Sequence, residues 1–90
     1  MANSKSALKR LRSAERRRLH NRTYRGQART AVKNAKRLMA TGRLEEANEA
    51  TRVAVVALDK AAQKGIIHKN NAARRKARLM RQLAKSERAA

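Results

Sequence analysis

Along most of this chain, apolar residues recur every three or four positions, which is the spacing that places them on one face of an α-helix. The first series predicts a helix from about Ser6 to about Thr41, with Ser4 or Ser6 as its N-cap and Gly42 just past its end. Its apolar face comprises Tyr24, Ala28, Ala31, Val32, Ala35, Leu38 and Met39. Upstream of these positions, only Leu8, Leu11 and Leu19 are large and apolar.

The pattern predicts two shorter helices after the first. The second covers about 44–64, and its apolar arc is wide enough to pack against two neighbours. Gly65 and Ile66 then fit a Schellman ending. The third helix begins between residues 68 and 71 and extends to about residue 86. One apolar stripe of this helix comprises Ala73, Ala77, Met80 and Ala84, with Ala72, Leu79 and Leu83 beside it.

Short connections between the helices indicate antiparallel neighbours, so the predicted fold is all-α, a three-helix up-down-up bundle with a long N-terminal helix. At 1.5 Å per residue, the three helices are about 54 Å, about 30 Å and about 27 Å long. The first half of the long helix therefore overhangs as a basic arm. We expect one domain over residues 1–90, divided into the arm (1–20), the rest of helix one (21–41), helix two (44–64) and helix three (68–86).

The composition predicts a thin core. Alanine supplies 19 of the 37 apolar residues, and Leu, Ile, Val and Phe together account for 14 of the 90. Few large apolar residues with a high net charge is a composition typical of chains that are disordered in isolation. The sequence contains no Cys, which excludes a disulfide scaffold, and no segment is apolar enough to span a membrane. The N-terminal residues also lack the apolar run of a secretory signal, so we expect a cytoplasmic protein.

Charge is distributed unevenly along the chain, whose net charge is +19. Residues 1–43 hold 14 Lys and Arg against one acid, a net charge of +13. Residues 44–60 hold two cations and four acids, a net charge of −2, and residues 61–90 hold nine cations and one acid, a net charge of +8. Helix two is thus the scaffold, while helices one and three present a surface for a polyanion.

The most regular basic feature is a ladder of cations in helix one, at steps of three and four residues. It comprises Arg18, Arg22, Arg25, Arg29, Lys33 and Lys36, which share one helical face. A related face continues along the arm through Lys9, Arg12 and Arg16. A merely solvated face would mix both signs of charge, whereas this one is nearly all positive. Arg outnumbers Lys 16 to 9, which favours folded RNA because one guanidinium group can donate two hydrogen bonds to a phosphate and can also stack on a base.

Several polar residues remain open to two interpretations. Asn70 and Asn71 are either RNA contacts or helix caps. Tyr24 could stack on a base, but it is in register with the apolar face, which favours packing in the core or at its rim. Gly26 lies inside helix one, where close approach by RNA or by helix two would explain it. His20 is interpreted as an RNA-facing residue of the arm.

Catalysis and metal binding find no support in this sequence. No phosphate-binding glycine loop, Cys–His pair or paired interior carboxylate is present, so we expect no enzyme. His20 and His68 lack acidic or thiol neighbours, so we expect no metal and no cofactor. Two competitors to folded RNA remain. One is nonspecific DNA compaction. The other is a helix that lies on a membrane surface, which would require more large apolar residues opposite its basic face than this chain has.

Three segments of the chain resemble the family of bacterial small-subunit ribosomal protein twenty. They are ANSKSALKR at residues 2–10, ERRRLHN at 15–21 and GIIHKNNAARRKARL at 65–79, the last being the most specific. The family usually has Ser where this chain has Ala77. The resemblance implies a three-helix bundle without enzymatic activity. It also implies direct binding to small-subunit (16S) ribosomal RNA early in assembly, bridging its 5′ domain and its 3′ minor domain.

The resemblance also nominates RNA contacts by position. On the arm side they are Asn3, Lys5, Ser6, Lys9, Arg10, Arg16, Arg17, Asn21 and Arg25. In the third block they are His68, Lys69, Asn70, Ala73, Arg74 and Lys76, with Arg75 between the last two. The cation pattern alone adds Arg12, Arg18, Arg22, Arg29 and Lys33.

Overall fold

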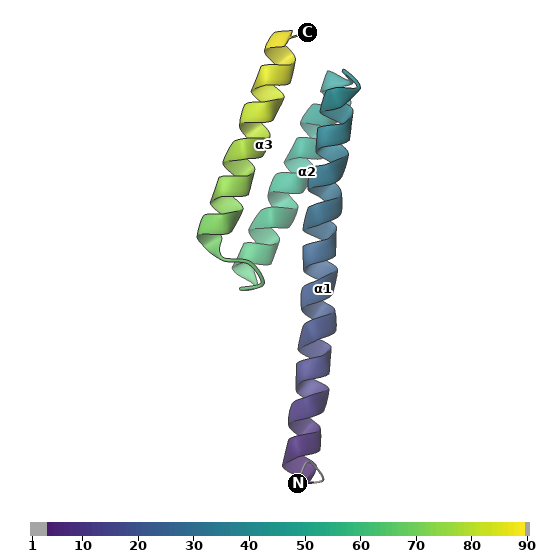
Figure 1. Cartoon of the computed structure of the whole chain (residues 1–90), viewed down its shortest axis with the longest axis vertical. Helices are drawn as coiled ribbons and strands as arrows, with labels where there is room; N and C mark the ends of the chain where they lie inside the picture. Colours follow the sequence, from purple (N-terminus) through teal and green to yellow (C-terminus); the bar gives the residue numbers. More distant parts are fainter. Residues whose placement is uncertain (1–3, 90) are drawn as a thin grey trace.

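A computed structural model of the chain describes residues 4–89. They form the helices α1 (Lys5–Ala40), α2 (Leu44–Gln63) and α3 (Lys69–Ala89), and no strand occurs among them. Successive helices run in opposite directions (Figure 1). The predicted all-α bundle with a long first helix is confirmed.

Side chains cap the starts of α1 and α3. The Ser4 hydroxyl accepts a hydrogen bond from the Ala7 amide at 3.2 Å, so Ser4 rather than Ser6 is the N-cap of α1. At the start of α3, the Asn70 amide donates to Nδ1 of His68 at 3.1 Å. Each bond satisfies one of the backbone donors that a helix leaves free at its first turn.

Glycines end both α1 and α2. Gly42 and Gly65 have φ angles of 77° and 75°, in the left-handed region where a side chain is strained. After α2, the Ile66 amide donates to the Ala61 carbonyl at 2.9 Å and the Gly65 amide to the Ala62 carbonyl at 3.0 Å. These two bonds are the predicted Schellman ending. Two tight reversals of the chain follow without any proline.

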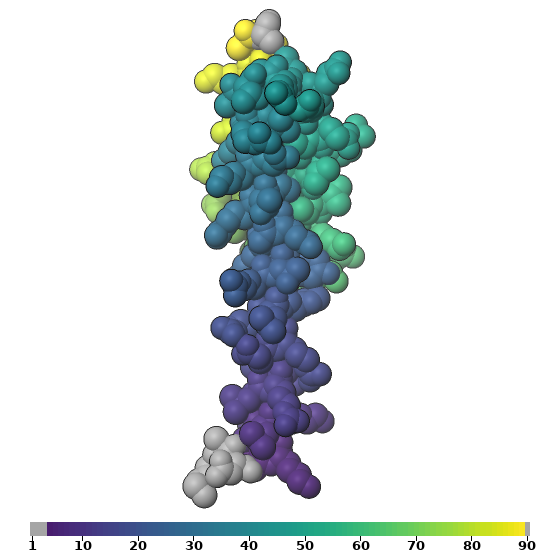
Figure 2. All heavy atoms as spheres, turned by 90° about the vertical axis from the view of Figure 1, so that its right-hand side faces the viewer, coloured from purple at the N-terminus to yellow at the C-terminus, as the bar shows by residue number. Residues whose placement is uncertain are grey.

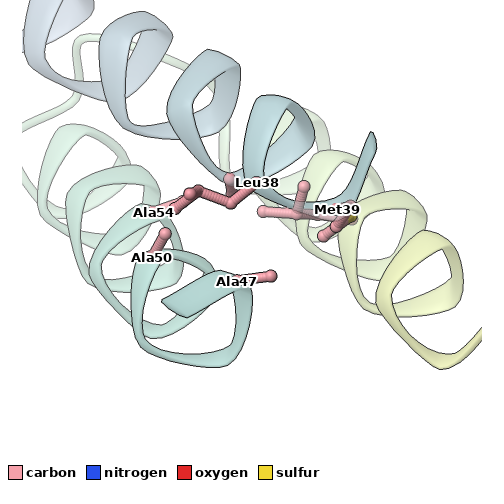
Figure 3. Packing of buried hydrophobic residues seen from close by; sticks show 7 residues of the cluster. Leu38, Met39, Ala47, Ala50 and Ala54 are labelled. Atoms are coloured by element: carbon pink, nitrogen blue, oxygen red, sulfur yellow. The ribbon is translucent and has the colours of Figure 1, made fainter. Parts of the chain in front are cut away.

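The core lies along α2, which contacts both other helices more extensively than α1 and α3 contact each other. Alanines dominate it, and Leu58 and Leu79 are the largest side chains that are fully buried. Figure 3 shows Leu38 and Met39 of α1 beside Ala50 and Ala54 of α2. Small side chains let the helix backbones approach closely, so the bundle is held by a narrow apolar seam.

Parts of the predicted apolar faces are wrong. Of the two adjacent stripes predicted for the third helix, the one formed by Ala73, Ala77, Met80 and Ala84 is exposed. The stripe beside it faces the core instead, with Leu79 buried and Leu83 partly buried. Leucine buries more apolar area than alanine, so the leucines decide which face packs. On α2, Val53 and Val56 are also exposed, which narrows the predicted arc.

The molecule is elongated because α1 outreaches its partners. Its extents are 63 × 22 × 16 Å, and its radius of gyration of 17.7 Å exceeds the value of about 12 Å for a compact chain of this length. In Figures 1 and 2 the first half of α1 extends alone beyond the turn between α2 and α3. Within residues 4–89, no helix is long and apolar enough to cross a bilayer.

Candidate nucleic-acid interface

The predicted cation ladder follows one continuous face of α1. Its first four members, Arg18, Arg22, Arg25 and Arg29, surround a shallow hollow beside Asn21 and Gly26. Its last four, Arg25, Arg29, Lys33 and Lys36, line a second hollow nearer the bundle. Because Arg25 and Arg29 belong to both, the placement of all six cations on one face is confirmed.

The second hollow is a groove between α1 and α3, with a volume of about 720 Å³. Four ladder cations form one wall, and Arg75 and Arg78 of α3 form the other. Among the described residues, no Asp or Glu lines it. The groove therefore concentrates positive charge from two helices, and only an anion would offset it.

The arm carries further cations on other faces. Lys9, Arg12 and Arg16 line a hollow shared with Lys5 and none of the ladder residues. At 3.6 residues per turn, Arg16 lies about a third of a turn from Arg22, so the related face predicted along the arm points away from the ladder's face. Arg10 and Arg17 line another hollow with Ser6. The arm is thus basic around its circumference.

The remaining arm candidates differ in what they contact. The cations at 5, 9, 10, 12, 16 and 17 are exposed, as is Ser6. Arg18 pairs with Glu15 at 2.6 Å on the surface, a contact that solvent weakens. Asn3 lies outside the described residues.

The base of the arm is fastened to the turn between α2 and α3. Arg25 Nη2 donates to the Ile66 carbonyl at 3.4 Å. Beside it, the Nζ atoms of Lys60 and Lys64 lie 5.9 and 5.0 Å from the centre of the Tyr24 ring, and His20 meets that ring edge-on at 4.7 Å. Tyr24 is half-buried among these groups, which confirms rim packing.

Gly26 has open space around it. An added Cβ would meet no atom within 4 Å apart from the helix's own backbone and the adjacent residues. Close approach by the second helix is therefore not the reason for this glycine. It sits instead in the arginine-lined hollow of the ladder.

Two of the seven RNA-contact candidates in the third block lie in the groove between α1 and α3. His68 and Arg75 line the groove, whereas Lys69, Asn70, Ala73 and Arg74 are exposed outside it. Lys76 Nζ lies 2.6 Å from Asp59 Oδ1 of α2, with 31% of its side chain exposed, so this cation ties α3 to α2.

The two asparagines do not cap α3. His68 takes that role, and Asn70 and Asn71 lie within the first turn. The cap interpretation is therefore wrong for both of them. Asn71 turns out to line the groove between α1 and α3.

Sequence reasoning did not name Ile67 or Arg78 as site residues, although both line the groove. Asn71, which it left open between RNA contact and helix cap, lines the groove as well. The signal was present, because His68, Asn71, Arg75 and Arg78 follow one another at steps of three, four and three. That spacing is the rule that revealed the ladder on α1. Within residues 4–89, no group of three His, Cys, Asp or Glu side chains could hold a metal.

This slender helical bundle carries rows of cations on two helices and a basic arm. These features define a polyanion-binding protein. Comparison with known proteins makes this class more specific. The model of the family described as Ribosomal protein S20 matches residues 2–84. The chain belongs to the ribosomal protein S20 family.

Similar curated proteins carry the name small ribosomal subunit protein bS20. One from Thermomicrobium roseum is 57% identical over 81 residues, covering 90% of this chain and 82% of that protein. One from Roseiflexus sp. strain RS-1 is 52% identical over 86 residues, covering 96% and 93%. One from Bacillus mycoides is 51% identical over 83 residues, covering 92% and 98%.

These matches confirm the family resemblance found in the sequence. Family membership makes the chain a structural protein of the ribosome and not an enzyme. It also gives the ribosome in the cytoplasm as its location.

Proposed function

We propose that this protein binds directly to small-subunit ribosomal RNA and stabilises its fold during assembly by neutralising phosphates. The observation that carries the proposal is the continuous face of six cations on α1, reinforced across a groove by Arg75 and Arg78. The family and the names of the relatives supply the partner. Phosphate contacts by Lys and Arg give most of the affinity in such complexes.

The arm acts by entering between RNA helices and pinning them. Its cations occupy several faces, so phosphates on more than one side can be neutralised at once. The family resemblance suggests the 5′ domain and the 3′ minor domain as the RNA regions that are joined. On the bundle side, His68, Arg75 and the ladder provide the second point of attachment.

Ordering of the arm is part of the proposed mechanism. No acidic residue stands in the first turn of α1 to offset the positive end of its dipole, and Lys5 and Lys9 make that end less favourable. Consecutive arginines at 16–18 repel one another. RNA phosphates turn these costs into contacts, so we infer that the arm becomes stably helical on binding.

A competition experiment tests the proposal. The full chain is titrated against small-subunit ribosomal RNA at physiological salt, with scrambled RNA of equal length and duplex DNA as competitors. We expect a preference of about a hundredfold or more for ribosomal RNA, equivalent to about 2.7 kcal/mol. Equal affinity for duplex DNA would overturn the proposal in favour of a nonspecific DNA-compacting protein.

A further inference from the structure

The groove between α1 and α3 has an apolar floor beneath its charged walls. Val32 and Ile67 are half-buried along it, and Ala28, Ile66 and Leu79 close it below. Phosphate oxygens gain nothing from aliphatic carbon, since charged groups stay solvated or paired with donors. A ligand that fills this groove therefore combines anionic groups with an apolar surface.

The walls and the floor together fit a nucleotide better than a duplex. A groove of about 720 Å³ lies within the range of about 300–1,000 Å³ that is usual for small-molecule-sized ligands. An RNA duplex presents mainly phosphates and riboses and keeps its bases stacked inside, which would leave the floor uncovered. An unpaired nucleotide has a base free to leave the stack and a phosphate on either side.

Resting on the proposed function, we propose that the α1–α3 groove binds one unpaired nucleotide of RNA. The base lies on Val32 and Ile67, and the flanking phosphates contact Arg29 of one wall and Arg75 of the other. Guanidinium groups suit this position because their planes also stack on bases. Tyr24 takes no part, since its ring already faces Lys60 and Lys64.

The test uses two synthetic RNA duplexes that differ by a single bulged 2-aminopurine nucleotide. We expect the full chain to bind the bulged duplex at least about fivefold more tightly, which corresponds to about 1 kcal/mol. The fluorescence of 2-aminopurine should change on binding. Equal affinity for both duplexes, with strong binding to each, would overturn the groove assignment and leave the proposed function intact.

Charge-matched variants locate the effect. Arg75→Gln with Arg78→Gln should abolish the preference for the bulge, whereas Arg81→Gln with Lys85→Gln should retain it. The second pair removes the same charge from exposed positions of α3 that do not line the groove. If both pairs lower affinity equally and preserve the preference, the groove is not the site.

A third variant, Ile67→Ser, changes the floor and keeps every charge. We expect it to lose the bulge preference while binding the unbulged duplex as the parent does. Its helical content and melting curve are measured first, because the Ile67 side chain is only half-buried and the fold should persist. A folded Ile67→Ser protein that still prefers the bulge would contradict the proposal. Failure of the parent to bind either RNA would instead count against the proposed function itself.

Discussion

Two of the three glycines in this chain suit the helix ends at which they lie, whereas the third weakens a helix interior. Gly42 and Gly65 adopt positive φ angles and reverse the chain after α1 and α2. Gly26 lies inside α1 in ordinary helical conformation, with open space where a Cβ would be. An exposed glycine at this position weakens the helix, and no neighbouring atom would clash with alanine in its place. The feature that surrounds Gly26 is the arginine-lined hollow of the ladder.

Substitution of these glycines should separate the two roles. Gly26→Ala should raise the free energy of unfolding by about 1 kcal/mol, because alanine favours a helix interior. Gly65→Ala should lower the free energy of unfolding by about 1–2 kcal/mol, because a side chain is strained in the left-handed region. Thermal melts followed by circular dichroism measure both. A lower melting temperature for Gly26→Ala would instead show that the folded protein requires a glycine at this position of α1.

Residue-scale prediction from the sequence succeeded where one local rule decides. The helix end at Gly65 follows from such a rule, and the serine cap of α1 was narrowed to Ser4 or Ser6, of which the structure selects Ser4. Prediction failed at Asn70 and Asn71, because several polar residues at 68–71 were able to cap α3. Only the path of the chain out of the α2–α3 turn selects His68.

At the scale of elements, α1 consists of two halves with different surroundings. Its second half contributes Ala28, Ala35 and Leu38 to the core, whereas its first half contacts neither neighbour extensively. We therefore expect the arm to contribute little to the free energy of unfolding of the bundle.

A double substitution on the arm tests this separation. Arg16→Ala with Arg17→Ala should weaken binding to small-subunit ribosomal RNA and leave the thermal unfolding of the bundle nearly unchanged, because both side chains are exposed. Arg43→Ala with Arg52→Ala removes the same charge outside the arm and serves as the control. A large drop in melting temperature for the arm variant would contradict the separation.

Hydrogen exchange of the free protein tests the ordering of the arm. Amides at 5–20 should exchange far faster than those of α2, because helices without tertiary contacts are marginal in water. Addition of small-subunit ribosomal RNA should slow them. Protected arm amides in the free chain would exclude coupled ordering.

Helix existence was predictable for all three elements, but the packing face of α3 was not. Periodicity fixes that a stripe exists, while the choice between two adjacent stripes depends on which one α2 meets. Leu79 and Leu83 outweigh the alanines in that choice. The same limitation hid the groove, since its two walls come from helices far apart in sequence.

At the scale of the whole molecule, the chain exposes more surface than its size requires. Its accessible surface of 7216 Å² compares with about 5,300 Å² for a typical folded monomer of this mass. The overhanging half of α1, which is rich in cations, extends beyond the other two helices and adds to this surface. A protein built this way holds much of its interaction area outside its own core.

The salt dependence of RNA binding should reflect this whole surface. If about 8–12 phosphates are contacted, the logarithm of the affinity should fall against the logarithm of salt concentration with a slope of roughly −6 to −11. The slope is obtained from a salt titration with small-subunit ribosomal RNA. A slope shallower than about −3 would mean that the ladder and the arm are not engaged together.

The cation faces of α1 point in different directions, so the width of this helix has a consequence for RNA binding. A single helix with its side chains is about 10–12 Å across. Two RNA backbones that contact the ladder face and the face of Lys9, Arg12 and Arg16 are held apart by that thickness. If RNA backbones contact both faces, the width of α1 sets the smallest distance between them, and its cations offset the repulsion between their phosphates.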